Sequence, residues 1–317
     1  MESITLNAHA KINLSLRIIG KRPDGYHEIV SFMQGTGLHD VVTIKKCSEN
    51  ATKYTCTRCN LNGLLVYLCT ASETMPTDKS NLAFKGADAF VKACEGSSLP
   101  GEVIVDIDKR LPVAAGIAGG SGNAAAVMLG LNALASYPLS LRDLMKAGEA
   151  VGADVPFSIF MNAYRNRNAL KELRGIEEAK DSAWIGGIGE IVEAAEPVTR
   201  MVILANPGTG VSTRAAYEAM DSIGYSDIDK TDRSLFVNDM ESYTLNEHAK
   251  AAELKRIMQE KLSADEVLMS GSGPSIVAYY NDGDKASKDI KLLAELTRAE
   301  RDIRMWLSDT GNKMQGE

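Results

Sequence analysis

The chain has 317 residues, of which 44% are apolar and 24% are charged. These proportions are typical of a soluble globular protein and exclude a disordered chain, a coiled coil and a collagen-like fibre. At roughly 150 residues per domain, the length predicts about two domains. Apolar runs are all shorter than the roughly 18 residues that a transmembrane helix needs, so we expect no membrane partner. The first residues alternate between polar and apolar types, so we also expect no signal peptide.

The charge balance is acidic, with 35 basic and 42 acidic side chains and a net charge of −7. This balance argues against a protein that holds long nucleic acids by neutralising phosphates. It is compatible with a small phosphorylated ligand, because backbone N–H groups at a helix N-terminus bind phosphate without a basic surface.

The five cysteines are odd in number, which favours reduced thiols and a cytoplasmic location. Cys56 and Cys59 form a single CxxC pair. A zinc ribbon needs a second such pair, which is missing, although Cys47 and Cys69 are near enough in sequence to complete four ligands. Metal binding and a role as small apolar residues both stay open.

A strict period of two runs through the first twenty residues, with apolar residues at every even position from Ile4 to Ile18. This period predicts a strand with one buried face and places Lys11 and Asn13 together on its polar face. The run is long for one strand, so we expect a bend or a short break within it.

Further along the chain, regular patterns alternate with turns. A helix beginning at Ser140 has a capping-box partner in Asp143 and a candidate stop at Gly152. Residues 162–182 are rich in charge and form either an exposed helix or an ordered insertion. We expect strands at 26–32, 41–45, 103–107 and 201–205, a strand–turn–strand over 267–280, and helices at 82–93, 213–220, 249–261 and 285–296. This mixture favours an α+β fold, with a domain 1–162 and a domain 163–317.

The glycine-rich run from Leu111 to Asn123 leads directly into a helical pattern. Glycines before a helix let the backbone approach a ligand closely, and the unpaired N–H groups of the first turn attract phosphate. The same run also suits a tight helix–sheet connection. It is neither a Walker loop nor a Rossmann fingerprint, because the Gly-Lys-Ser/Thr ending and the GxGxxG spacing are both missing.

Four further segments carry candidate chemistry. Asp154 precedes Val155-Pro156 and is either a helix N-cap or a general base that accepts a hydroxyl proton. Lys11 is of interest if another element covers its face of the strand. The run from Arg22 to Glu28 is a Pro-Asp-Gly turn, or a site where Tyr26 and His27 hold a planar base. The run from Ser270 to Pro274 is a hairpin turn, or a second backbone wall of a site.

Taken in order, these pieces resemble the GHMP small-molecule kinases across nearly the whole chain. The matching runs are Ala10–Leu14, Arg22–Glu28, Pro112–Leu131, Gly152–Phe157, Gly187–Glu190, Val211–Thr213, Asn238–Glu241 and Met269–Pro274. The glycine runs are shared by the whole superfamily. The Pro-Asp-Gly-Tyr-His run is narrower and points to a cytidyl-diphosphate substrate.

The resemblance implies a two-domain fold, with an N-terminal domain like the second domain of ribosomal protein S5 and a ferredoxin-like C-terminal domain. It implies ATP-dependent phosphorylation of the 2-hydroxyl of the methylerythritol part of the substrate, in isoprenoid precursor synthesis, with Mg²⁺. Lys11 and Asp154 match the catalytic pair, Tyr26 and His27 match the cytosine-holding positions, and Asn13 matches a substrate-side position. The implied ATP loop consists of Pro112, Val113, Ala114, Ala115, Gly116, Ile117, Ala118, Gly119, Gly120, Ser121 and Gly122.

Two departures from the family pattern fall in this loop, which usually reads Gly-Gly-Gly-Ser-Ser and here reads Ala118-Gly-Gly-Ser-Gly122. We therefore expect Gly122→Ser to be tolerated and to strengthen ATP binding. The stretches 47–77 and 157–187 are also longer than the family pattern predicts. The alternatives to the cytidyl substrate are phosphorylation of homoserine or mevalonate, and nucleotide binding without catalysis.

Overall fold

The structure is a computed structural model that describes residues 1–47, 56–94, 99 and 101–311. Two compact units are built from interleaved segments. The first contains Met1–Ala10, Leu38–Val113 and Ala118–Asp181, and the second contains Lys11–Gly37, Ala114–Ile117 and Ser182–Glu317. Residues 163–181 thus group with the first unit, and the division at residue 162 into two family domains stays a prediction.

Two long strands, β1 (Ser3–Lys21) and β2 (His27–Lys46), contribute residues to both units. The expected break in β1 is absent, and the two strands expected at 26–32 and 41–45 are one strand of 20 residues. Residues 29–36 of β2 are buried on both faces. Strands that are covered on both faces lose their polar–apolar alternation. The sequence pattern therefore did not predict a strand in the middle of β2.

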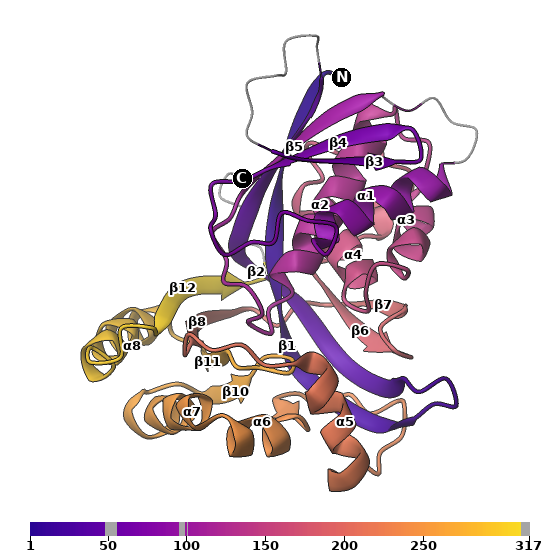
Figure 1. The fold of residues 1–317 in the computed structure, drawn as a ribbon. Helices are drawn as coiled ribbons and strands as arrows, with labels where there is room; N and C mark the ends of the chain where they lie inside the picture. Colours follow the sequence, from indigo (N-terminus) through magenta and orange to yellow (C-terminus); the bar gives the residue numbers. More distant parts are fainter. Residues whose placement is uncertain (48–55, 95–98, 100, 312–317) are drawn as a thin grey trace. The chain divides into compact units, whose positions relative to one another are not determined.

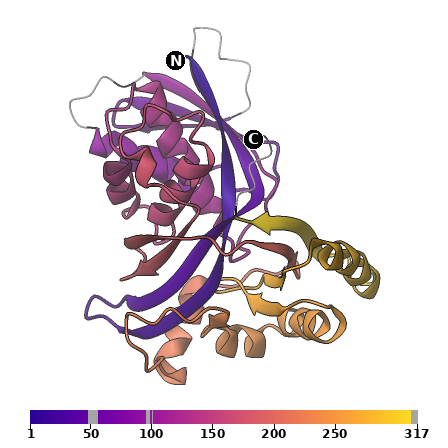
Figure 2. The same cartoon turned by 180° about the vertical axis from the view of Figure 1, so that it is seen from behind.

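In the first unit, parts of β1 and β2 join three shorter strands in the order β3-β4-β5-β2-β1. The helices of this unit gather on one face of these strands (Figures 1 and 2). The shorter elements are β3 (Thr57–Leu61), β4 (Leu64–Cys69), β5 (Glu102–Asp108), α1 (Leu82–Ala93), α2 (Gly119–Leu134), α3 (Leu141–Gly148) and α4 (Val155–Arg165).

The helix predictions for this unit are largely confirmed. The helix expected at 82–93 has those bounds, and the capping box between Ser140 and Asp143 is present at the start of α3. The stop expected at Gly152 is wrong, because α3 already ends at Gly148. A Cβ on Gly148 would lie 2.8 Å from Ile159 Cδ1 and 3.0 Å from Val155 Cγ1, so the chain turns where α4 packs closely against it.

The charged stretch after α4 is an ordered insertion, which was one of the two alternatives. It holds a short 3-10 helix, η1 (Ile176–Glu178), and it buries Leu170 and Leu173. Its two ends are joined by an ion pair from Arg165 Nη2 to Asp181 Oδ2 at 2.6 Å, and both side chains are almost fully buried.

The second unit contains a ferredoxin-like β-α-β-β-α-β arrangement, in which every pairing is antiparallel and the strand order is β10-β11-β8-β12. Its elements are β8 (Arg200–Asn206), α5 (Thr213–Ile223), α6 (Glu241–Glu247), α7 (Ala249–Lys261), β10 (Glu266–Met269), β11 (Ile276–Tyr280), α8 (Gly283–Leu296) and β12 (Arg304–Thr310). β6 (Ser182–Gly186) pairs with β2 and with β7 (Ile191–Ala195), and β9 (Val237–Asn238) pairs with β1.

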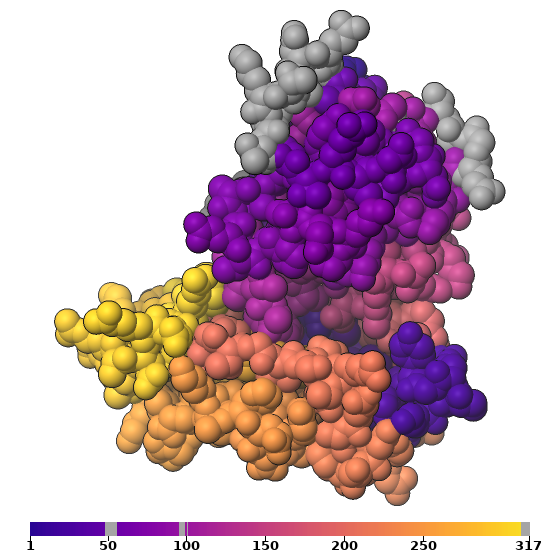
Figure 3. All heavy atoms as spheres, viewed as in Figure 1, coloured from indigo at the N-terminus to yellow at the C-terminus, as the bar shows by residue number. Residues whose placement is uncertain are grey.

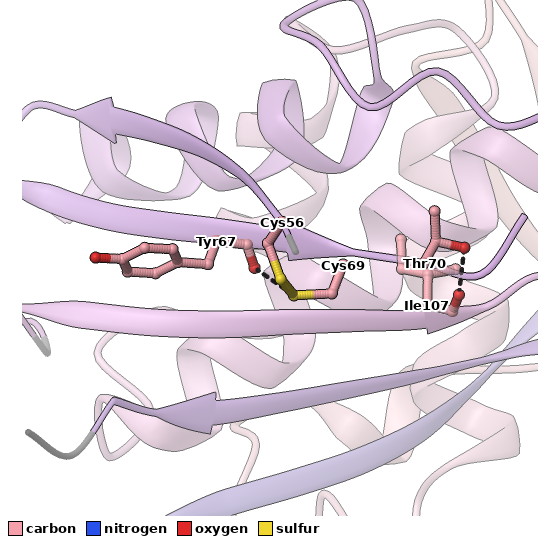
Figure 4. Close-up of a disulfide and its surroundings, with 5 residues drawn as sticks. All are labelled: Cys56, Tyr67, Cys69, Thr70 and Ile107. Atoms are coloured by element: carbon pink, nitrogen blue, oxygen red, sulfur yellow. Dashed lines mark hydrogen bonds between the residues drawn. A yellow bond between two sulfur atoms is a disulfide. The ribbon is translucent and has the colours of Figure 1, made fainter. Parts of the chain in front are cut away.

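Cys56 and Cys69 form a disulfide across the β3–β4 hairpin (Figure 4). The expectation of five reduced thiols is therefore wrong for these two residues, and Cys56 cannot join Cys59 as a thiolate pair. The expectation failed because spacing along the chain does not reveal that Cys56 precedes the strand paired with Cys69. Next to the bridge, the Thr70 hydroxyl donates to the Ile107 carbonyl at 2.8 Å and ties the end of β4 to β5.

Within the described residues, no three His, Cys, Asp or Glu side chains gather as a metal site would require. None of the helices in this part of the chain is both long enough and apolar enough to cross a bilayer.

Candidate functional site

The polar face of β1 is covered in the second unit, where Lys11 and Asn13 have only 3% and 1% of their surface exposed. Lys11 Nζ donates to Asn13 Oδ1 at 2.7 Å, and Asn13 Nδ2 donates to Ser31 Oγ at 2.9 Å. A buried ammonium group is costly unless it is hydrogen-bonded. This chain of contacts therefore fixes the direction of the Lys11 side chain and meets the condition under which Lys11 becomes a candidate site residue.

One part of the glycine segment, Ala114–Ile117, belongs to the same unit as Lys11. The Lys11 N–H donates to the Ile117 carbonyl at 3.1 Å, and the Ser270 hydroxyl donates to the Gly116 carbonyl at 3.1 Å. A Cβ on Gly116 would collide with the Ser270 carbonyl and would lie 2.7 Å from the Gly273 carbonyl. Only glycine fits this close approach of two backbones.

The run Ser270–Pro274 lies in the turn of the β10–β11 hairpin, and its backbone forms a wall beside these residues. Its role in a site stays a prediction. A Cβ on Gly271 would lie 3.6 Å from Lys11 Nζ and 3.4 Å from Asn13 Oδ1, which places the wall against both side chains. Asn238 Nδ2 donates to the Gly271 carbonyl at 2.8 Å, and the Thr244 hydroxyl donates to the Ser272 carbonyl at 3.0 Å. Side chains from other elements thus add to the backbone hydrogen bonds that the loop makes within itself.

The other part of the glycine segment lies in the first unit, where the buried Asp40 anchors its entrance. Asp40 Oδ2 accepts from Lys109 Nζ at 2.7 Å, and Oδ1 accepts from the backbone N–H groups of Arg110 and Leu111 at 2.7 and 2.8 Å. A carboxylate with three donors is well stabilised even when buried. The anchor brings the chain from β5 into the loop in one defined direction.

The N-terminus of α2 offers the donors that a phosphate needs. Its N-cap, Ala118, has a left-handed backbone (φ 55°) and makes no side-chain cap, and the first helical bond runs from the Gly122 N–H to the Ala118 carbonyl at 2.8 Å. No acceptor for the N–H groups of Gly119, Gly120 and Ser121 occurs among the described residues. Such groups, together with the helix dipole, attract an anion.

The structure overturns the expectation for Gly122. A Cβ at this position would lie 2.9 Å from the His9 carbonyl, which belongs to the backbone of β1 and cannot swing away. Gly122 is therefore required by close helix–strand packing, and the serine of the family pattern does not fit here. This contact could not be predicted from local patterns, because His9 and Gly122 are far apart along the chain.

Asp154 precedes α4, and its side chain makes no capping hydrogen bond to that helix. Its carbonyl accepts from the Ser158 N–H at 3.0 Å and from the Ser158 hydroxyl at 2.7 Å. The N-cap interpretation is thereby weakened. Asp154 and Lys11 belong to different units, so their pairing stays a prediction.

The Arg22–Glu28 run forms the predicted turn between β1 and β2. The Gly25 N–H donates to the Arg22 carbonyl at 2.9 Å, and the Arg22 N–H donates to the Tyr26 carbonyl at 2.7 Å. Tyr26 is 60% exposed, so its ring is not a packing residue of the sheet. His27 is buried and stacks on Tyr217 of α5, with 5.3 Å between ring centroids and 27° between planes.

Asp221 of α5 gathers three donors beside this turn, and Figure 3 shows the turn in indigo against the orange atoms that include α5. Its Oδ1 accepts from His27 Nε2 at 2.6 Å and from the Tyr225 hydroxyl at 2.8 Å, and its Oδ2 forms an ion pair with Lys21. The hydrogen bonds from Lys21, His27 and Tyr225 lower the pKa of Asp221. The same carboxylate raises the pKa of both Lys21 and Tyr225.

The same unit contains a pocket of about 180 Å³. Glu28, Trp184 and Ile191 are among its lining residues, and the Arg233 guanidinium lies 4.8 Å from the Trp184 ring centroid. An aromatic wall with charged groups at its edge suits a planar polar molecule.

Comparisons with known proteins agree with these structural features. The family described as GHMP kinases N terminal domain matches residues 81–162. The 4-diphosphocytidyl-2-C-methyl-D-erythritol kinase of Alkaliphilus metalliredigens is 33% identical over 311 residues, which cover 93% of this chain and 94% of that protein. The enzyme of the same name from Lachnoclostridium phytofermentans is 34% identical over 305 residues, with 91% of each chain covered.

The chain belongs to the GHMP kinase family. The predicted α+β fold of that family is also confirmed by solved structures. A 4-(cytidine 5'-diphospho)-2C-methyl-D-erythritol kinase superposes with a TM-score of 0.70 at 24% identity and covers 98% of this chain and all of its own. Homoserine kinase from Cytophaga hutchinsonii gives a TM-score of 0.60 at 15% identity and covers 98% of this chain and 95% of its own.

Of the predicted site residues, the second unit brings together Lys11, Asn13 and the Ala114–Ile117 part of the loop, with Tyr26 and His27 at the β1–β2 turn. Asp154 and the remaining loop residues lie in the first unit of this GHMP kinase. Sequence reasoning missed Asp221 and Trp184. Asp221 is an ordinary acidic position in a helical pattern, whereas Trp184 is one of only two tryptophans and could have been noticed.

Proposed function

We propose that this chain transfers the γ-phosphoryl group of ATP to the 2-hydroxyl of 4-diphosphocytidyl-2-C-methyl-D-erythritol, in isoprenoid precursor synthesis. The observation that carries the proposal is similarity of 33–34% over more than nine-tenths of the chain to kinases of that name. The exposed Tyr26 ring beside the buried His27 supports a substrate that contains a planar base.

In the proposed reaction, the substrate oxygen attacks the γ-phosphorus while the bond to the β–γ bridging oxygen breaks and ADP leaves. Asp154 accepts the proton of the attacking hydroxyl. Lys11 stabilises negative charge near the reacting oxygens, and Asn13 holds its ammonium group in place. Such transfers depend mainly on positioning and electrostatic stabilisation, which a buried and hydrogen-bonded lysine provides.

ATP is the phosphoryl donor that this family implies. We propose that the N-terminus of α2 receives its phosphates, since the N–H groups of Gly119, Gly120 and Ser121 have no acceptor among the described residues. Gly119 and Gly120 leave room for this approach, because a Cβ there would meet only side-chain atoms at 3.3 Å or more. The anchor at Asp40 keeps the loop entrance fixed.

Mg²⁺ is a proposal that the described residues suit only in part. They contain no group of three acidic, histidine or cysteine side chains for it, so the phosphates and water would supply most of its ligands. Ser121 has the only hydroxyl of the Pro112–Gly122 loop and would be the ligand from that loop. When bound, the ion would neutralise charge on the phosphates.

The cytosine is proposed to lie at Tyr26 and His27. Stacking of a base on an aromatic ring is sequence-tolerant and stabilising, and the ring of Tyr26 is exposed enough to offer a face. Glu28, the residue that follows His27 in β2, lines the pocket that also contains Trp184.

A coupled ADP-release assay tests the proposal with three substrates: the cytidyl-diphosphate compound, homoserine and mevalonate. We expect ADP release with the cytidyl compound alone. Activity with homoserine or mevalonate alone would contradict the proposal, and absence of activity with all three would favour a nucleotide-binding protein without catalysis.

We also propose that the protein acts in the cytoplasm and binds no nucleic acid. The net charge of −7 supports the second statement. The odd number of cysteines supports a cytoplasmic location less strongly now that Cys56 and Cys69 form a disulfide. The proposed location therefore depends on the need for ATP.

A further inference from the structure

We infer that Asp221 is a positioning residue that holds His27 in the Nε2–H form and leaves the Nδ1 lone pair free to accept a hydrogen bond from the base. The inference rests on the proposed function only for the identity of the ligand. The arrangement of Asp221 and His27 is a property of the second unit by itself.

The direction of the proton follows from the contacts of Asp221. Three donors surround its two oxygens, namely Lys21, His27 and Tyr225. An ionised carboxylate only accepts hydrogen bonds. His27 Nε2 lies 2.6 Å from Oδ1 and must therefore carry the hydrogen. In a neutral imidazole the other nitrogen, Nδ1, is then an acceptor.

Lys21 and Tyr225 make this arrangement secure at neutral pH. Both donate to Asp221, and their hydrogen bonds act with that of His27 to lower its pKa. The Lys21 ammonium group also supplies a positive charge beside Oδ2. Asp221 thus stays ionised and cannot exchange donor and acceptor roles with the imidazole.

The plane of the His27 ring is held by α5 as well. Tyr217 and Asp221 lie one helical turn apart, so they face the same side of α5. Tyr217 stacks on the ring, and Tyr225 meets it edge-on with 6.1 Å between centroids. The His27 side chain is only 5% exposed. Two ring contacts and one hydrogen bond leave the imidazole a single orientation.

The remaining nitrogen is available to a ligand. Within the described part of the chain, no group forms a hydrogen bond with His27 Nδ1. An acceptor at this position matches an amino group on the base, such as the exocyclic amine of cytosine. Uracil has a carbonyl oxygen at the corresponding position, and two acceptors facing one another are unfavourable. Asp221 therefore favours a cytidyl over a uridyl group without touching either.

The tautomer is measured directly by ¹⁵N–¹H correlation spectra of the imidazole rings. The chain has four histidines, and His27 is assigned by the signals that disappear in His27→Gln. We expect the wild-type spectrum to show a protonated Nε2 and a bare Nδ1, and Asp221→Asn to show a mixture of the two forms. A wild-type spectrum with the proton on Nδ1 overturns the inference whatever the enzyme phosphorylates.

Kinetics test the consequence for binding. We expect Asp221→Asn to raise the Michaelis constant for the cytidyl substrate about tenfold, as for the loss of one hydrogen bond, and to leave kcat and the Michaelis constant for ATP within about twofold. The preference over the uridyl-diphosphate analogue should fall by a similar factor. Equal changes in both Michaelis constants would mean a structural role and would overturn the inference.

Two variants serve as controls. Glu218→Gln removes the same charge from the same helix, but its partner is Arg214 at 2.7 Å, so the His27 spectrum and the base preference should not change. Tyr225→Phe removes one donor to Asp221 and keeps the contact with His27. It should preserve the Nε2–H form, and a mixed tautomer in Tyr225→Phe would contradict the inference even if Asp221→Asn fails to fold. Loss of activity with an intact wild-type tautomer would count against the proposed function alone.

Discussion

Asp154 makes no capping hydrogen bond to α4, so its replacement separates chemistry from helix stability. We predict that Asp154→Asn folds normally and still binds ATP, but turns over at least about a hundredfold more slowly, as expected for loss of a general base. Steady-state ADP release together with calorimetric ATP binding measures both quantities.

Asp143 provides the matched control, because it does form a capping box with Ser140 at the start of α3. Asp143→Asn should lower the free energy of unfolding by about 1 kcal/mol and leave turnover unchanged. If Asp154→Asn behaved like Asp143→Asn, Asp154 would be a structural residue.

Gly122 and Gly120 give opposite expectations for the same substitution in one loop. Gly122→Ser should reduce both stability and ATP affinity, because the new Cβ would lie 2.9 Å from the His9 carbonyl. Gly120→Ser should be tolerated, since its Cβ would meet only Leu82 Cδ1, at 3.3 Å, the flexible end of a side chain. Thermal unfolding and ATP titration of both variants check this prediction. A well-tolerated Gly122→Ser would show that the backbone of β1 can move away from the new Cβ.

Ala118 sits in the left-handed region that favours glycine. We predict that Ala118→Gly raises the free energy of unfolding by about 1 kcal/mol, because a Cβ in this region costs about that much. Ala126→Gly within α2 should instead lower it by about 1 kcal/mol or more. Urea unfolding measures both, and a loss of stability in Ala118→Gly would mean that the methyl group has a packing role.

At the scale of elements, α4 holds the N-terminal part of β1 through two asparagines. Asn162 Oδ1 accepts from the buried His9 N–H at 2.8 Å, and Asn166 Oδ1 accepts from the exposed Asn7 N–H at 2.9 Å. The two asparagines are one helical turn apart, and their acceptors serve alternate residues of the strand. The two amide oxygens thereby accept hydrogen bonds from backbone N–H groups on an edge of β1 where no other strand of the described residues pairs.

This contact predicts unequal effects of one substitution. Asn162→Leu should lower the free energy of unfolding by about 1–3 kcal/mol, because the buried His9 N–H loses its hydrogen bond to Asn162. Asn166→Leu should cost much less, since water can replace the amide at the exposed Asn7. Equal losses in denaturant unfolding would contradict the account of this edge.

Local sequence patterns correctly predicted the helices that have one partly exposed face. The helix at 82–93, the helix at 249–261 and the capping box of α3 all follow from short-range periods and caps. The middle of β2 was missed because it is buried on both faces. The end of α3 was missed because packing against α4, rather than a local stop residue, decides it.

At the scale of the whole molecule, the predicted site depends on contacts between distant residues. Resemblance to the family indicated Lys11, Asn13 and the glycine loop, and the structure explains why Lys11 is not an ordinary exposed lysine. The partner of His27 could not be predicted, because Asp221 is 194 residues away and lies in an ordinary amphipathic helix. The disulfide partner of Cys56 likewise emerges only from strand pairing.

The central claim is phosphoryl transfer to a cytidyl-diphosphate substrate, and the identity of the product tests it most directly. Phosphorus NMR of a reaction that contains ATP, Mg²⁺ and 4-diphosphocytidyl-2-C-methyl-D-erythritol follows every phosphorus atom at once. We predict that one new phosphomonoester signal, coupled to the methylerythritol carbons, grows in step with ADP while the diphosphate bridge stays intact. Growth of inorganic phosphate in its place, or no change beyond the starting compounds, would contradict the account.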